Sequence, residues 1–200
     1  MRKITMEDFK LALKFSGKTI ANYSDELLND VVNKYNSNPN SISIISAGGR
    51  SAELFKLALA MLNTKTPKEI LAETKTTTNS CNCNTCQAMC HQCPCLGTPR
   101  EMMKLATMPE YQNNISISLI ANPIVIGEFG KPITMLTPDF DEVKGHCSFL
   151  VNGLCSLHDA GLKPLEGKTA SCNVTDGKKS FDIYKSICEE WEKLSNNFKK

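Results

Sequence analysis

The densest feature of this chain is a group of cysteines that places six thiols within fifteen residues. The members are Cys81, Cys83, Cys86, Cys90, Cys93 and Cys95. Thiolates are soft donors that favour zinc, copper(I) and iron–sulfur clusters, and packing alone rarely requires so many sulfur atoms so close together. The segment therefore predicts a metal-binding region.

The cellular compartment decides whether cysteines act as metal ligands or form disulfides. The amino terminus has no apolar run of signal-peptide length. No stretch approaches the roughly 18 uninterrupted apolar residues of a membrane span. We therefore expect a cytoplasmic protein without a membrane segment, in which reduced cysteines serve as metal ligands.

Charge and composition limit the classes of partner. The chain has 200 residues, of which 41% are hydrophobic, so it can bury a globular core. Its net charge is only +2, with 23 basic residues scattered against 21 acidic ones. This balance argues against nucleic-acid binding, which usually requires a basic patch.

Apolar residues before the cluster recur at helical spacing. The pattern predicts helices over 7–15, over 25–35 after a Ser24 cap, and over 52–62, with a shorter helix from Pro67. The glycine pair before the third helix is either a turn or a cradle for an anion. We treat residues 1–78 as one helical region.

The segment after the cluster alternates short helical and extended patterns. Thr98 precedes Pro99, which predicts a capped helix ending by Met108. Ile115, Ile117 and Leu119 alternate with serines, a pattern typical of a half-buried strand. Short strands are expected near 125 and 133–135.

A second cysteine group follows at Cys147, Cys155 and Cys172. Asn152-Gly153 is a strong signal for a tight hairpin turn, which would bring Cys147 and Cys155 near one another. His158 lies three residues beyond Cys155, within reach of the same centre if the chain coils. Residues 79–175 are therefore treated as the cysteine-cluster metal-binding region.

The last segment, 176–200, predicts an amphipathic helix. Its apolar seam consists of Phe181, Tyr184, Cys188, Trp191, Leu194 and Phe198, with charged residues such as Glu190 around it. We expect the seam to pack on the amino-terminal helical region or on a second copy, giving a homodimer. Cys188 belongs to this seam, so it is expected to be a buried apolar residue and not a ligand.

Parts of both cysteine groups are similar to a known family. Cys86, Cys90, Cys93 and Cys95 before the Pro99 helix, together with Cys147-x-Phe149, Gly153-x-Cys155, Lys163-Pro164 and Cys172, resemble the zinc- or iron-chelating cysteine-cluster family with a C-x-x-C-x-x-C-C motif. The resemblance covers roughly residues 81–173 and implies metal binding without a defined reaction. This chain departs from the motif in having Cys93-Pro94-Cys95 in place of adjacent cysteines.

The combined prediction is an α-dominated fold with small irregular β structure, in which the helical amino-terminal region and the last helix pack on a metal-stabilised, cysteine-rich middle. We expect two Zn²⁺ ions with structural roles and a function exerted by binding a partner. One ion would use Cys86, Cys90, Cys93 and Cys95, or a mixture of these with Cys81 and Cys83. The other would use Cys147, Cys155 and Cys172 with His158 or a sulfur from the first group.

An enzyme is the alternative hypothesis. Cys86, Cys90 and Cys93 have the spacing that radical S-adenosylmethionine enzymes use for a [4Fe–4S] cluster. The repeated strand–helix units of such enzymes are missing after the motif, because glycine and proline interrupt the chain. The sequence assigns no catalytic residue and leaves open whether the chain is an enzyme.

Overall fold

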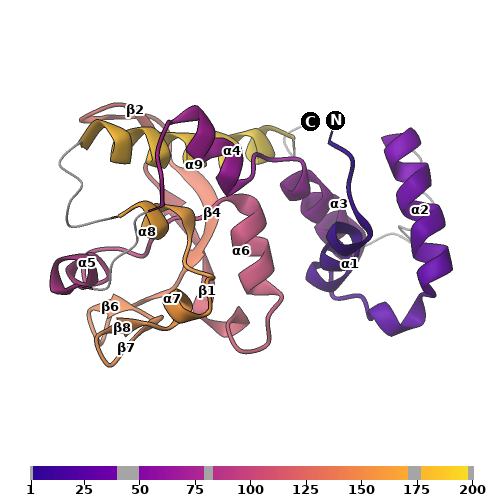
Figure 1. Ribbon diagram of the computed structural model, residues 1–200, viewed down its shortest axis with the longest axis horizontal. Coiled ribbons are helices and arrows are strands. Elements are labelled where there is room, and N and C mark those ends of the chain that lie inside the picture. Colours follow the sequence, from indigo (N-terminus) through magenta and orange to yellow (C-terminus); the bar gives the residue numbers. More distant parts are fainter. Residues whose placement is uncertain (1, 40–49, 79–82, 171–176, 198–200) are drawn as a thin grey trace. The chain divides into compact units, whose positions relative to one another are not determined.

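The computed structural model describes residues 2–39, 50–78, 83–170 and 177–197 (Figure 1). The chain forms two compact units, Met1–Asn63 and Thr64–Lys200. About 52% of the chain is helical and 15% is strand, which confirms a mostly helical fold with small sheets. The Gly48-Gly49 pair, Cys81 and Cys172 lie outside the described residues.

The first unit consists of helices. These are α1 (Met6–Phe15), the short 3-10 helix η1 (Ile20–Asn22), α2 (Asp25–Ser37) and α3 (Arg50–Leu62). Ser24 caps α2 as predicted, because its side chain accepts a hydrogen bond from the Leu27 N–H. Phe9 of α1 meets Phe55 of α3 edge to face, with 5.3 Å between ring centres. Apolar faces of these helices therefore form the core of this unit.

The second unit contains the remaining helices and all of the described strands. Its helices are α4 (Pro67–Glu73), α5 (Asn84–Met89), α6 (Pro99–Ala106), η3 (Gln112–Asn114), α7 (Ser156–Asp159), α8 (Leu165–Thr169) and α9 (Gly177–Asn197). Thr66 and Thr98 begin α4 and α6 with capping boxes, in which the threonine and a glutamate three residues later each bind the other's backbone N–H. Local sequence therefore determines where these two helices start.

The strands pair only as two-stranded antiparallel sheets. Their pairs are β1 (Ile115–Ile120) with β4 (Ile133–Pro138), β2 (Pro123–Val125) with β3 (Glu128–Phe129), β5 (Phe140–Asp141) with β6 (His146–Cys147), and β7 (Leu150–Val151) with β8 (Leu154–Cys155). The last three pairs are very short, so they depend on surrounding contacts for stability.

Strand β1 forms where the alternating pattern predicts a strand. The face that carries Ile117 and Leu119, however, is exposed. Ile117 and Leu119 are 75% and 72% exposed. Ser118 lies on the opposite, half-buried face, where its hydroxyl is 2.7 Å from that of Thr137 on β4. Alternation determines which side chains share a face, whereas the position of the core decides which face is buried.

Helix α9 buries Cys188, Trp191 and Leu194 of the predicted seam against its own unit, whereas Phe198 lies outside the described residues. It packs on β4, α4, α8 and β2, of which α4 belongs to the predicted helical region 1–78. Cys188 has no exposed surface, which confirms its prediction as a buried apolar residue. The Trp191 indole N–H donates a 2.9 Å hydrogen bond to the Gly97 carbonyl oxygen. This bond ties α9 to the start of α6.

Glu190, one of the charged residues beside the apolar seam of α9, is itself buried. It is 2% exposed, and its carboxylate accepts hydrogen bonds from the Lys65 backbone N–H and from the Lys193 ammonium group. The carboxylate thus links α9 to the segment that leads into α4. Helical spacing alone could not identify this partner, since Lys65 is distant in sequence.

We expect Glu190→Ala to lower the free energy of unfolding by roughly 1.5–3 kcal/mol, because the Lys65 N–H loses a charged acceptor. Urea denaturation followed by circular dichroism measures this change. Glu190→Gln should cost less, since its amide oxygen can still accept from Lys65. The exposed neighbour Glu189 provides the control. An Ala variant at 189 that costs as much as the one at 190 would contradict the buried role.

Candidate functional site

Four cysteines from both groups line one small cavity of about 10 Å³. They are Cys90, Cys95, Cys147 and Cys155, and the other lining residues are Pro138, Phe149, Leu157, Lys163 and Pro164. The first two cysteines flank the turn after α5, and the last two belong to β6 and β8. The fold therefore gathers thiols that are more than fifty residues apart in the sequence.

Backbone contacts hold the two cysteine groups together. The Cys147 N–H donates a 2.7 Å hydrogen bond to the Cys90 carbonyl oxygen. Asn152 and Gly153 have φ angles of +51° and +76°, the left-handed conformation of a tight hairpin turn. That turn pairs Leu150 with Cys155, so the predicted approach of Cys147 and Cys155 is confirmed by their shared cavity.

Helix α8 packs closely against Cys95. The Glu166 N–H donates to the Leu96 carbonyl oxygen at 3.0 Å, and the Leu96 N–H donates to the Glu166 carboxylate at 2.6 Å. A Cβ atom on Gly167 would lie 2.9 Å from both the Cys95 sulfur and the Lys163 Cε. Only glycine therefore allows this close approach of helix and thiol.

Burial favours the neutral form of three of these thiols when no cation is present. It raises the pKa of Cys147 to about 12 and also raises the pKa values of Cys90 and Cys95. The buried ammonium group of Lys163, 7% exposed, acts in the opposite direction on Cys90 and Cys95. A bound cation would supply the much larger stabilisation that thiolates need in such a place.

The four cysteines fit a tetrathiolate site in chemical type and in number. Structural zinc sites of this kind have four sulfur ligands at about 2.3 Å from the metal. Among residues 2–39, 50–78, 83–170 and 177–197, no group of three or more His, Cys, Asp or Glu side chains is arranged as a metal site as it stands. The four thiols therefore line a common space, but they are not arranged as a metal site.

The structure divides the predicted ligand residues differently from the two predicted sets. Cys93 lines a different cavity, and neither Cys83 nor His158 lines the cysteine cavity, where Leu157 takes the place next to Cys155. The side chain of Cys86, like all of Cys81 and Cys172, lies outside the described part. The predicted set of Cys147, Cys155 and Cys172 with a sulfur from the first group has its described members in this cavity, while Cys172 lies outside the described residues.

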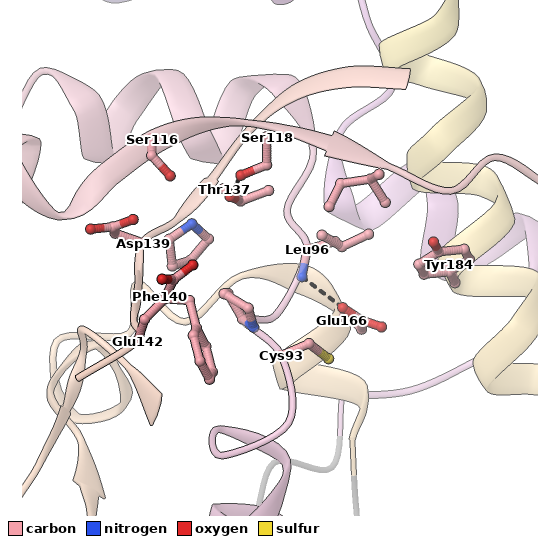
Figure 2. A pocket seen from close by; sticks show the side chains of 13 residues that line it. Cys93, Leu96, Ser116, Ser118, Thr137, Asp139, Phe140, Glu142, Glu166 and Tyr184 are labelled. Carbon is pink, nitrogen blue, oxygen red and sulfur yellow. Dashed lines mark hydrogen bonds between the residues drawn. The ribbon is translucent and has the colours of Figure 1, made fainter. Parts of the chain in front are cut away.

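A larger pocket of about 360 Å³ adjoins the cysteine cavity, and Pro138 lines both (Figure 2). Its apolar lining residues are Pro94, Leu96, Ile120, Pro138 and Phe140. Its polar lining residues are Cys93, Ser116, Ser118, Thr137, Asp139, Glu142, Glu166 and Tyr184. The lining of this pocket therefore combines three carboxyl groups, several hydroxyl groups and an apolar wall.

Three groups in this pocket have raised pKa values, Tyr184, Glu166 and Cys93, and burial is the main cause for each. Burial raises the pKa of Glu166 to about 7, against the opposing effect of the Leu96 N–H. Burial and the nearby Glu166 carboxyl raise the pKa of Cys93, so this residue is a neutral thiol at neutral pH. Cys93 is therefore poorly suited to act as a nucleophile.

Sequence reasoning missed Lys163 and Glu166 as site residues. Lys163 was visible only as part of the Lys163-Pro164 step, and no spacing rule connects Glu166 with Leu96. Ser116 and Ser118 carry a signal in the alternation of β1, but the alternation does not state which face of the strand lines a pocket. These residues were missed because their neighbours come from other segments.

Comparisons with protein-family models, with curated proteins and with solved structures gave no match to this chain. A search of the helices over the described residues found none that is both long enough and apolar enough to cross a membrane. The two cavities are therefore the features of this chain that bear on its function.

Proposed function

We propose that this chain is a zinc-binding protein whose metal is held by Cys90, Cys95, Cys147 and Cys155. The observation that carries the proposal is that these four thiols, from two separate cysteine groups, line one cavity. The resemblance to the zinc- or iron-chelating cysteine-cluster family supports the same chemistry, since all four residues belong to the motifs that carry it.

The proposed metal is structural. Four thiolates complete the tetrahedral coordination of Zn²⁺ and leave no open position for water or substrate, so such a site does not catalyse. It contributes folding free energy, roughly 10–16 kcal/mol in small zinc peptides. The strands next to the cavity have two residues each, which is the kind of local structure that requires a metal or a large core.

Lys163 supports this site through its charge. Four thiolates and one Zn²⁺ ion carry two excess negative charges, and burying an uncompensated charge is costly. The buried Lys163 lines the same cavity and offsets part of that charge.

The cluster-enzyme alternative is less well supported by the same geometry. It requires Cys86, Cys90 and Cys93 to bind one [4Fe–4S] cluster, whereas Cys90 and Cys93 line different cavities. We propose instead that the chain acts by binding a partner. A second Zn²⁺ ion, with ligands from Cys81, Cys83, Cys86 and Cys172, completes the proposed metal content.

Elemental analysis of protein purified without oxygen tests the metal directly. We expect one to two zinc ions per chain, no iron, and no absorption in the visible range, because Zn²⁺ has a filled d shell. About four iron atoms with a broad visible band would overturn the zinc proposal in favour of the cluster. Protein that is folded and free of both metals would overturn metal binding altogether.

A further inference from the structure

The pocket beside the cysteine cavity has the size and lining of a small-molecule site. Its volume of about 360 Å³ lies within the range of roughly 300–1,000 Å³ that is usual for ligand pockets. Such pockets combine an apolar wall with a few placed polar groups. Both kinds of residue are present in this pocket. Pro138 is the one lining residue that the pocket shares with the cysteine cavity.

The charges of the pocket select the class of ligand. Asp139, Glu142 and Glu166 line it, and none of the residues described as lining it is Lys, Arg or His. Asp139 and Glu142 are both exposed, and within the described part of the chain neither side chain forms an ion pair or hydrogen bond. A phosphate or carboxylate ligand would be repelled here, whereas a cation would be attracted to these carboxylates.

The distribution of the carboxylates favours an organic cation over a bare metal ion. Figure 2 shows Asp139 and Glu142 on one side of the pocket and Glu166 on the other. Hard metal ions require several oxygen ligands around one point. Phe140 adds an aromatic ring, which attracts organic cations, and the hydroxyl groups of Ser116 and Thr137 can accept N–H donors.

We propose that this pocket binds a protonated amine or a guanidinium group carried on a short apolar chain. The cationic group would pair with the carboxylates, and the chain would lie against Phe140, Pro138 and Ile120. The same chemistry is offered by a free small molecule and by a lysine or arginine side chain of a partner protein.

The cysteine cavity and the pocket share structural supports. Cys95 lies between Pro94 and Leu96, which both line the pocket, and Phe140 is the strand partner of Cys147. The Leu96 N–H also holds the Glu166 carboxylate in place. Loss of metal from the cavity should therefore weaken cation binding, a consequence that rests on the proposed function.

Isothermal titration calorimetry of the full chain, with the metal it retains on purification, tests the pocket. The probe is n-butylguanidinium, and its neutral and anionic counterparts are n-butylurea and n-butyl phosphate. We expect saturable binding of one probe per chain with a Kd on the order of 1 mM, and binding at least about tenfold weaker for both counterparts. Equal binding of all three probes, or no binding of n-butylguanidinium, would overturn the proposal.

Substitutions of the pocket carboxylates test whether guanidinium binds in this pocket. The double substitution Asp139→Asn with Glu142→Gln should weaken guanidinium binding by about tenfold or more, while the exposed Glu110, which is not a lining residue, provides the control Glu110→Gln. Equal weakening by the control would show unspecific charge attraction and overturn the site.

A capped arginine peptide that binds more tightly than n-butylguanidinium would identify a protein side chain as the ligand, and weaker binding would identify a free cation.

Different experimental results would refute the zinc site and the cation-binding pocket. The pocket double variant should keep its zinc, whereas Cys155→Ser should lose zinc and weaken guanidinium binding. A protein that contains no zinc but binds guanidinium in this pocket would refute the metal site and keep the pocket. A zinc-loaded protein that does not bind guanidinium would refute the pocket alone.

Discussion

Cys155→Ser is expected to release about one equivalent of zinc and to unfold the region around the cysteine cavity. The serine oxygen is a hard donor that does not replace a thiolate on zinc, so three sulfur ligands remain. Because zinc in such sites contributes roughly 10–16 kcal/mol to folding, even a partial loss exceeds the total stability of most domains. The neighbouring strands β5 to β8 have two residues each and cannot compensate.

Metal content, thermal melting and hydrogen exchange measure this effect. Fast exchange should appear in the strands around the cavity, while α1, α2 and α3 belong to the other unit and should retain their protection. Cys93→Ser is the matched control, because Cys93 lies two residues from Cys95 but lines the other pocket. Unchanged zinc and melting in Cys155→Ser would refute the assignment of this residue. Equal loss of zinc in Cys93→Ser would show a different set of ligands.

Trp191→Ala is expected to lower the free energy of unfolding by about 3–5 kcal/mol. The indole is 4% exposed and belongs to the seam by which α9 packs on the second unit. Removing it leaves a large cavity and also leaves the Gly97 carbonyl oxygen without its buried N–H donor. Few substitutions outside the cysteine cavity remove so much buried surface and a buried hydrogen bond together.

Trp191→Phe separates the two contributions. Phenylalanine retains most of the apolar volume but lacks the N–H, so we expect a cost of roughly 1–3 kcal/mol. Denaturation by guanidinium chloride, followed by far-ultraviolet circular dichroism, measures both variants. A cost below about 1 kcal/mol for Trp191→Ala would contradict the packing of α9 against this unit.

Local signals in the sequence were enough to locate most helices and the hairpin. Threonine caps at Thr66 and Thr98, the serine cap at Ser24 and the Asn152-Gly153 turn each act within four residues of the chain. Their energetics do not depend on distant segments, so the elements appear where the patterns predict them.

The faces and partners of these elements were not predictable in the same way. The side of β1 that is buried depends on where α6 and β4 lie, and the burial of Glu190 depends on Lys65. A periodic pattern states which residues point together and contains no information about which side meets the core.

By itself, the sequence determined that this chain has an abundance of thiols, a mostly helical fold and a buried Cys188 on the last helix. Only the tertiary structure decided that Cys90 and Cys95 meet Cys147 and Cys155 around one cavity while Cys93 faces another. The physical reason is that this grouping depends on contacts across long stretches of chain, such as the Cys147 N–H bond to Cys90 and the approach of Gly167 to Cys95. Spacing in a sequence specifies ligand types and local reach, whereas a binding site is a set of positions in space.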